Sequence, residues 1–146
     1  MVRIIQIEEH VGITGQLHLA DVRDLAAEGV KYIINNRPDG EVSDQPLTAD
    51  LAAEAERLGV SFFDIPFVYP APAQIIEFAD VLKDANGLVV VYCRSGQRST
   101  ILWAAAKMVL GTPIDEVVAM AKEADVDLER AATYIVDLAK EAAKTQ

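Results

Sequence analysis

Residue types that define several functional classes are scarce in this sequence of 146 residues. It contains one cysteine, which excludes an internal disulfide and fits a reducing compartment, and two histidines whose spacing matches no metal-binding pattern. Lysine and arginine number 13 against 23 acidic residues, so the formal net charge is −10. A nucleic acid ligand would instead require a basic face. We expect no metal, no cofactor and no nucleic acid partner.

Long apolar runs are also absent. The longest, residues 101–110, is interrupted by Lys107 and falls far short of the roughly 20 residues that cross a membrane. The apolar run within residues 1–9 is too short for a secretory signal. With 51% hydrophobic and 25% charged residues, the composition is typical of a globular domain. We therefore predict a cytoplasmic protein without a membrane partner.

Predicted strands and helices alternate along the chain, without repeats or a break in composition. Strands are expected at residues 2–7, 12–16, 31–35, 60–66 and 88–92, and helices at residues 19–28, 48–58, 72–84, 101–110, 113–124 and 128–144. Thr48 is the predicted cap of the second helix. Such alternation favours a central, mostly parallel sheet with helices on both faces. We predict a single α/β domain over residues 1–146, with a helical C-terminal end.

The single cysteine, Cys93, stands where a buried strand is predicted to end. Residues 88–92 are apolar and follow the turn residues Asn86 and Gly87, a pattern typical of a strand that is covered on both faces. A short loop comes next, and Ser99 then opens a helical stretch. Strand, loop and helix in this order aim backbone N–H groups and the positive end of a helix dipole at one point.

This position favours a thiolate at Cys93, because a helix N-terminus and nearby arginines lower the pKa of a thiol below its free value of about 8.5. The alternative is that Cys93 is only a small buried apolar residue, as free cysteines often are. That alternative does not explain Gly96, which permits a tight turn, or Arg98, whose guanidinium can fold back over the loop. We predict that Cys93 is a nucleophile.

The run from Cys93 to Ser99, CRSGQRS, resembles the anion-binding loop of cysteine-dependent phosphatases and rhodaneses. Together with Gly15-Gln16 and the sequence IINNRPDGE at residues 33–41, it is similar to one bacterial family in particular. Members of that family are candidate phosphatases found fused to metallo-β-lactamase-like hydrolases, and the family is also described as one of sulfur transferases. The similarity extends over about residues 13–110 and implies a dual-specificity-phosphatase-like α/β fold.

The fold and the resemblance together indicate where the site lies. Ligands of such sheets bind beyond the carboxyl ends of the strands, so the loops at residues 35–41, 67–72 and 93–99 should converge. Ser99 is expected to donate to the sulfur or to cap the helix. The predicted catalytic residues are Cys93, Arg98 and Ser99, and the predicted substrate-binding residues are Arg94, Ser95, Gly96, Gln97, Arg37 and Asn35. For the last two, the alternative is that Asn-Arg-Pro-Asp-Gly simply forms a good turn.

The length of the loop differs from that of tyrosine and dual-specificity phosphatases. They carry five residues between the cysteine and the arginine, whereas four separate Cys93 from Arg98, as in rhodaneses. Each residue contributes at most about 3.3–3.6 Å of chain, so a shorter loop makes a tighter ring of amides. The spacing favours the terminal sulfur of a persulfide over a tetrahedral phosphate.

The proton donor of those phosphatases also has no counterpart. An aspartate that protonates the leaving alcohol would be expected near Val68 or Tyr69, and Asp64 stands too early, inside a predicted strand. Sulfur transfer needs no such acid, because the leaving sulfite or thiolate is a stable anion.

Three functions follow from these features, and we predict sulfur transfer. In this reading Cys93 takes a sulfane sulfur from thiosulfate or a low-molecular-weight persulfide, holds it as a persulfide, and passes it to a thiol or cyanide. Protein partners in sulfide oxidation are a further expectation. The alternative is phosphomonoester hydrolysis through a cysteinyl-phosphate. A third hypothesis is a sensor that binds an anion or a persulfide without catalysis.

Overall fold

The structure is a computed structural model that describes residues 2–146, so Met1 of the predicted domain lies outside it. Five strands form one sheet in the order β1-β2-β5-β3-β4. They are β1 (Ile5–Glu8), β2 (Val11–Thr14), β3 (Val30–Asn35), β4 (Ser61–Asp64) and β5 (Leu88–Tyr92). Only β1 and β2 pair antiparallel; the other neighbours are parallel. The carboxyl ends of β2, β5, β3 and β4 therefore meet at one edge of the sheet.

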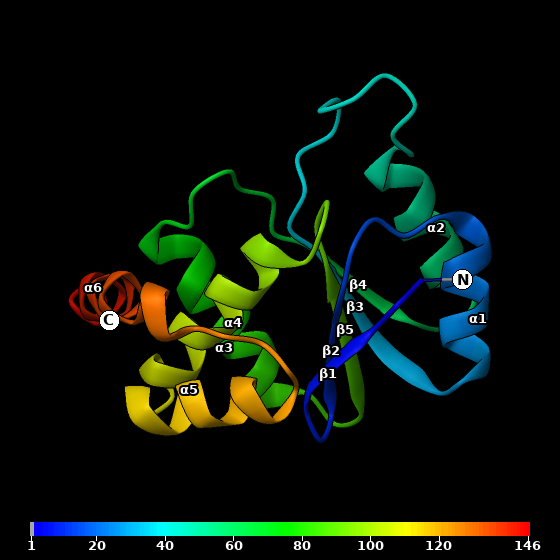
Figure 1. The fold of residues 1–146 in the computed structure, drawn as a ribbon. Helices are drawn as coiled ribbons and strands as arrows, with labels where there is room; N and C mark the ends of the chain where they lie inside the picture. The colour runs from blue at the N-terminus through cyan, green and yellow to red at the C-terminus, as the bar shows by residue number, and fades with distance from the viewer. Residues whose placement is uncertain (1) are drawn as a thin grey trace.

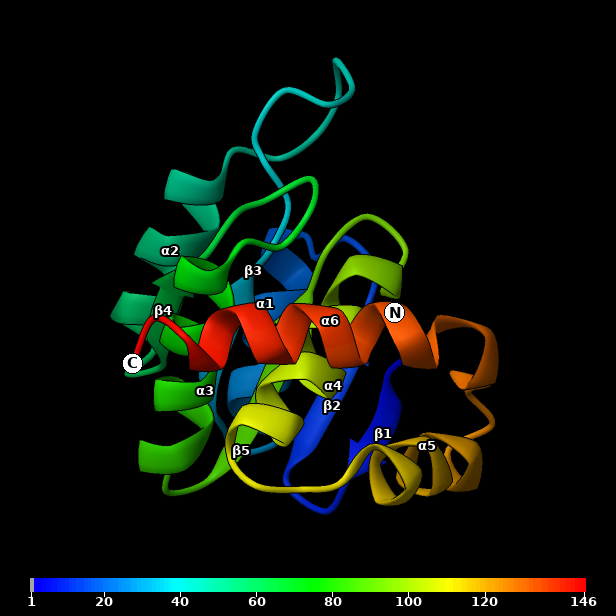
Figure 2. The same cartoon turned by 90° about the vertical axis from the view of Figure 1, so that its left-hand side faces the viewer.

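Helices cover both faces of the sheet (Figure 1). On one face lie α1 (Leu19–Ala27) and α2 (Thr48–Arg57), and on the other lie α3 (Pro72–Asp84), α4 (Gln97–Val109), α5 (Ile114–Glu123) and α6 (Ala132–Ala143). Figure 2 shows α6 crossing over α3 and α4, and both helices contact it. The predicted fold, a mostly parallel sheet between helices with a helical C-terminal end, is confirmed.

The central helix α4 is held by packing on nearly all sides. Five consecutive residues are completely buried: Leu102, Trp103, Ala104, Ala105 and Ala106. A helix buried all round gains its stability from tertiary contacts rather than from its own propensity. The Trp103 indole N–H also donates to the Glu8 carboxylate of β1 at 2.6 Å. Because α4 cannot shift independently of its neighbours, the loop before its first turn is fixed in place.

Some predicted boundaries were wrong. α4 begins at Gln97 rather than after Ser99, so that Arg98 and Ser99 belong to its first turn. The last predicted helix is divided into a short 3-10 helix, Glu129–Ala131, and α6. Within residues 2–146 no helix has the length and apolar character needed to cross a membrane.

The start of α2 is stabilised by Asp39 rather than by the predicted cap. Thr48 is the first helical residue, and the preceding Leu47 offers no side-chain cap. The Asp39 Oδ1 accepts from the Thr48 N–H at 2.9 Å and from the Thr48 hydroxyl at 2.7 Å. A residue nine positions upstream thus performs the capping role and ties the loop between β3 and α2 back onto the helix.

We expect Asp39→Ala to lower the free energy of unfolding by about 1 kcal/mol, the usual cost of a lost helix cap. The reason is that the Thr48 N–H would have no side-chain acceptor. Urea denaturation, followed by circular dichroism, measures the change. Asp44→Ala, on the exposed part of the same loop, is the matched control. Equal stability of both variants would contradict the capping role.

Candidate active site

The loop from Cys93 to Arg98, called here the Cys loop, folds its backbone around the sulfur of Cys93. Cys93 directly follows β5 and is only 1% exposed. The Gly96 N–H donates to Cys93 Sγ at 3.0 Å. Gly96 has a φ of 96°, a left-handed conformation that glycine adopts without steric cost. Because α4 starts at the next residue, its positive dipole end lies at the loop.

The surroundings of Cys93 shift its pKa in opposite directions. Burial raises the pKa of the thiol, because it penalises the charged form. Hydrogen bonds from the Ser99 hydroxyl and from the backbone N–H groups of Ser99, Ser95 and Gly96 lower it more, so that the net pKa of Cys93 lies below its ordinary value. The ring of donors therefore supports a thiolate at this buried sulfur.

Ser99 connects the sulfur to the next loop. The Ser99 side chain is fully buried, and its hydroxyl donates to Asn36 Oδ1 at 2.8 Å. The same hydroxyl is also a donor to Cys93. A hydroxyl has one proton, so it serves one acceptor at a time, and an ionised sulfur attracts it more strongly than a neutral amide does. Of the two predicted roles, the cap is wrong, because Ser99 lies inside the first turn of α4; donation to the sulfur stays a prediction, which the lowered pKa of Cys93 supports.

Gly15 and Gln16 lie against the back of the Cys loop. The Gln16 N–H donates to the Arg94 carbonyl at 3.3 Å. A Cβ atom on Gly15 would come within 2.9 Å of the same carbonyl oxygen, so only glycine permits this approach. Of the other loop residues predicted to bind substrate, Arg94, Ser95 and Gln97 are exposed, and Ser95 lines a shallow hollow together with Gly15 and Gln16.

Arg98 is held in position by a carboxylate from another loop. Its Nη1 and Nη2 donate to Glu41 Oε2 and Oε1 at 2.9 and 2.8 Å, a bidentate pair. Nη1 also donates to the Phe67 carbonyl at 3.1 Å. Arg98 thus joins the three predicted loops at one point, as expected. The hydrogen bonds to Glu41 raise the pKa of the Arg98 guanidinium, which keeps its charge.

Glu41 is the centre of this network, and the sequence prediction missed it. Its Oε1 also accepts from Arg37 Nε at 2.9 Å. The hydrogen bond from Arg98, together with that from Arg37, outweighs the effect of burial and lowers the pKa of Glu41 to about 2. The carboxylate is therefore ionised throughout the neutral range. Its position in the NRPDGE motif was visible, but no local signal linked it to Arg98, 57 residues away.

Two predicted substrate-binding residues have structural roles instead. Arg37 is 4% exposed, and its guanidinium is bound to Glu41 and, through Nη1, to Gln16 Oε1 at 2.9 Å. Asn35 is 1% exposed; its amide binds the Arg37 backbone and donates to Asp64 Oδ1 at 2.8 Å. Both side chains are buried and already paired, so neither is available to a ligand. They build the loop that presents Glu41.

No carboxyl group stands where a phosphatase of this type holds its general acid. Asp64 ends β4 and is bound to Asn35. The loop between β4 and α3, residues 65–71, contains no acidic residue. Glu41 is in direct contact with Arg98, but its pKa of about 2 makes it a poor proton donor at neutral pH. The arrangement thus provides a nucleophile and an anion-binding arginine, without a carboxylic acid for the leaving group.

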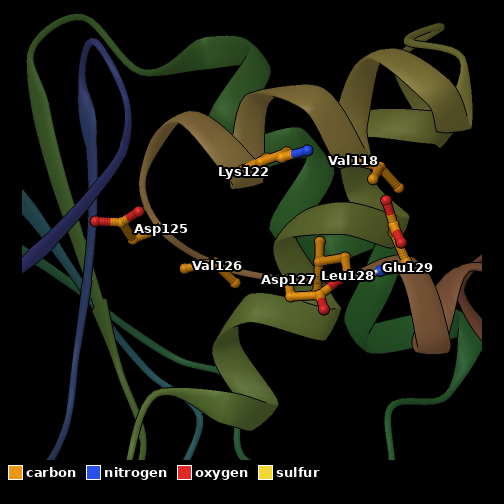
Figure 3. A pocket seen from close by; sticks show the side chains of 7 residues that line it. All are labelled: Val118, Lys122, Asp125, Val126, Asp127, Leu128 and Glu129. Atoms are coloured by element: carbon orange, nitrogen blue, oxygen red, sulfur yellow. Dashed lines mark hydrogen bonds between the residues drawn. The ribbon is translucent and has the colours of Figure 1, made fainter.

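A separate hollow of about 320 Å³ opens in the helical end (Figure 3). It is lined by Val118, Lys122, Asp125, Val126, Asp127, Leu128 and Glu129. None of these residues lies at the carboxyl edge of the sheet, and Cys93 takes no part in the hollow. Across residues 2–146 there is no cluster of three or more side chains suited to hold a metal ion.

The fold and the Cys loop together define a phosphatase-like protein. Residues 3–109 match the model of the family described as "Beta-lactamase hydrolase-like protein, phosphatase-like domain". The chain belongs to this family, as its sequence motifs indicated.

Relatives support the same assignment. A structure from Neisseria meningitidis, described as that of a candidate phosphatase, has a TM-score of 0.77 and 33% identity, over 92% of this chain and 97% of that one. A beta-lactamase hydrolase-like protein of Xylella fastidiosa is 34% identical over 91% of this chain. The match covers only 32% of that protein, so this chain spans about a third of its length.

More distant structures share the fold alone. The kinase associated phosphatase has a TM-score of 0.77 with 13% identity, covering 98% of this chain and 96% of that one. The comparisons give no support to the predicted sulfur transfer, and the alternative prediction of a cysteine phosphatase fits them better.

The hydrogen bonds around Cys93 predict its titration. The rate of alkylation by iodoacetamide, measured against pH, should have its half-point below that of a free thiol, because these hydrogen bonds lower the pKa of Cys93. Ser99→Ala should move this half-point upward, because it removes a donor to the thiolate. Ser95→Ala is the matched control, since Ser95 acts through its backbone N–H. A wild-type half-point at or above that of a free thiol would show that the loop does not activate Cys93.

Proposed function

We propose that this chain hydrolyses phosphomonoesters through a cysteinyl-phosphate on Cys93. The observation that carries the proposal is the pairing of a buried sulfur, surrounded by amide and hydroxyl donors, with an arginine that Glu41 holds beside it. A thiolate there is a ready nucleophile, and the fixed guanidinium can compensate the charge of three phosphoryl oxygens. The family and the fold favour the same chemistry.

The proposed reaction has two steps. The Cys93 thiolate attacks phosphorus, an S–P bond forms, and the ester P–O bond breaks with its electron pair leaving on the oxygen of the leaving group. Water then attacks phosphorus, the S–P bond breaks, and inorganic phosphate leaves as the thiolate is restored. Arg98 and the loop amides bind the phosphoryl oxygens in both steps. The Ser99 hydroxyl stabilises the sulfur when it departs as a thiolate.

The absence of a carboxylic acid near the leaving group restricts the substrates. An alkoxide is a poor leaving group unless it is protonated, whereas a phenolate or a carboxylate leaves as a stable anion. Residues 65–71 carry no acidic side chain, and Glu41 is committed to Arg98 and Arg37. We infer that the substrates are activated phosphomonoesters, such as aryl phosphates, rather than alkyl phosphates.

The two arginines of the Cys loop should have different kinetic effects. Arg98→Ala should lower kcat for para-nitrophenyl phosphate by about 10²–10³-fold, because it removes stabilisation of the transition state. Arg94→Ala is the matched control: its exposed side chain can only attract the anion, so KM should rise with little change in kcat. Steady-state kinetics measure both. Cys93→Ser should remove all turnover, since a hydroxyl does not ionise. Equal losses of kcat at both arginines would contradict this assignment.

Sulfur transfer is the second candidate, and one observation favours it. Only four residues separate Cys93 from Arg98, and the Cys loop closes with a direct bond from Gly96 N–H to the sulfur. A ring of this size suits the single terminal sulfur of a persulfide. The Cys93 thiolate would attack the sulfane sulfur of thiosulfate, the S–S bond would break, and sulfite would leave with the electron pair. A thiol or cyanide would then take up the sulfur.

Mass spectrometry separates the two candidates. After incubation with an aryl phosphate and an acid quench, we expect Cys93 to carry a phosphoryl group; after incubation with thiosulfate, the phosphatase proposal predicts unmodified Cys93.

Insertion of one glycine between Gly96 and Arg98 restores the five-residue spacing. If the native loop is too tight for phosphate, the insertion should strengthen inhibition by vanadate. A stable persulfide on the native protein, without phosphatase turnover, would replace the proposal by sulfur transfer. Binding of either anion without turnover would indicate a sensor.

A further inference from the structure

Two large apolar side chains stand exposed on the loop that reaches Arg98. Tyr69 is 81% exposed and Val68 is 57% exposed, whereas the neighbouring Phe67 is buried at 6%. The Phe67 carbonyl accepts from Arg98 Nη1 at 3.1 Å, and its N–H donates to the Asn36 carbonyl at 3.1 Å. The exposed pair therefore begins one residue beyond a point fixed to the Cys loop.

The segment that carries Tyr69 is stiff. Three of the six prolines in the chain, Pro66, Pro70 and Pro72, lie within seven residues. Each fixes its own φ, and Pro70 also restricts Tyr69 to extended conformations. At the far end, the Ala71 N–H donates to Gln74 Oε1 at 2.8 Å. Tyr69 is thus presented from a short arch anchored at both ends, so that little entropy is lost when a ligand binds it.

Tyr69 lies within reach of the mouth of the site. It follows Phe67 by two residues, so their Cα atoms are at most about 7 Å apart. Phe67 in turn touches the guanidinium that would hold the phosphoryl group. Tyr69 is therefore two residues along the chain from the carbonyl that binds this guanidinium.

We propose that Tyr69 is a stacking wall for a flat aromatic leaving group, and that the phosphorylated substrate is an aryl ester rather than another activated phosphate. The inference rests on the proposed phosphatase function and deepens it. Leaving groups that depart without a proton include aryloxides and carboxylates, and of these two only an aryloxide has a ring that can stack on an exposed aromatic face. Val68 extends the apolar surface on the same arch.

Two substrates and three variants test the proposal. Para-nitrophenyl phosphate releases para-nitrophenolate and acetyl phosphate releases acetate; neither anion needs a proton donor, but only the first substrate has a ring. Tyr69→Ala should lower kcat/KM for the aryl substrate about 3- to 10-fold and leave acetyl phosphate unchanged, which is the gain expected of an aromatic pair. Tyr69→Phe keeps the ring and should behave as the wild type. Tyr134→Ala, at an exposed tyrosine on α6, is the control for a general effect of losing a surface ring.

Other outcomes overturn the stacking role in distinct ways. Equal losses with both substrates would show that Tyr69 acts on the loop rather than on the ring. A loss of kcat in Tyr69→Phe would indicate that the Tyr69 hydroxyl is a proton donor instead.

If wild-type protein hydrolyses neither substrate, the proposed function fails. The stacking role is then tested by binding affinity alone. The Cys93→Ser variant should bind phenyl phosphate more tightly than inorganic phosphate. Adding Tyr69→Ala to this variant should remove the difference in affinity. Equal affinities before that change would refute the wall.

Discussion

The bidentate pair between Glu41 and Arg98 is the interaction on which the geometry of the site depends. It joins the loop after β3 to the first turn of α4, and the bond from Arg98 to Phe67 adds the loop after β4. An arginine without this partner could adopt many rotamers, and its charge would be spread over the mouth of the site. With both Nη atoms bound, the remaining N–H groups keep a fixed direction. A chain with a net charge of −10 thus retains one oriented cation for an anionic substrate.

Further hydrogen bonds connect the pair between Glu41 and Arg98 to the residues around it. Glu41 accepts hydrogen bonds from two cations, Arg98 and Arg37, which together lower its pKa to about 2. Arg37 is itself buried and requires Gln16 as a further partner. Gln16 in turn touches the Cys loop through the Arg94 carbonyl. The motifs at residues 15–16, 33–41 and 93–99 are therefore parts of one hydrogen-bonded network, which is why they occur together in the sequence.

Local patterns revealed the parts of the site that belong to one segment. The strand before Cys93, the glycine at the turn and the helix after it were all predicted, because each depends on residues a few positions apart. Local patterns did not show that Arg37 and Asn35 are buried and paired, because their partners include Gln16 and Asp64, which lie far from them along the chain. Glu41, Asn36 and Gln16 were missed for the same reason: their partners are Arg98, Ser99 and Arg94, dozens of residues away along the chain. The position of Asp39, which caps α2, likewise depends on how the intervening loop closes.

The same long separations affect how the protein acquires its reactivity. The bidentate pair between Arg98 and Glu41 spans 57 residues, so it forms only when the loop after β3 meets the first turn of α4. Such non-local contacts carry a loop-closure entropy and tend to form late in folding. During synthesis and early folding, Arg98 therefore lacks the carboxylate that fixes its direction, whereas the donors to Cys93 lie within six residues of it along the chain. The oriented guanidinium arises only together with the native topology, so the unfinished chain carries the sulfur without a complete anion site.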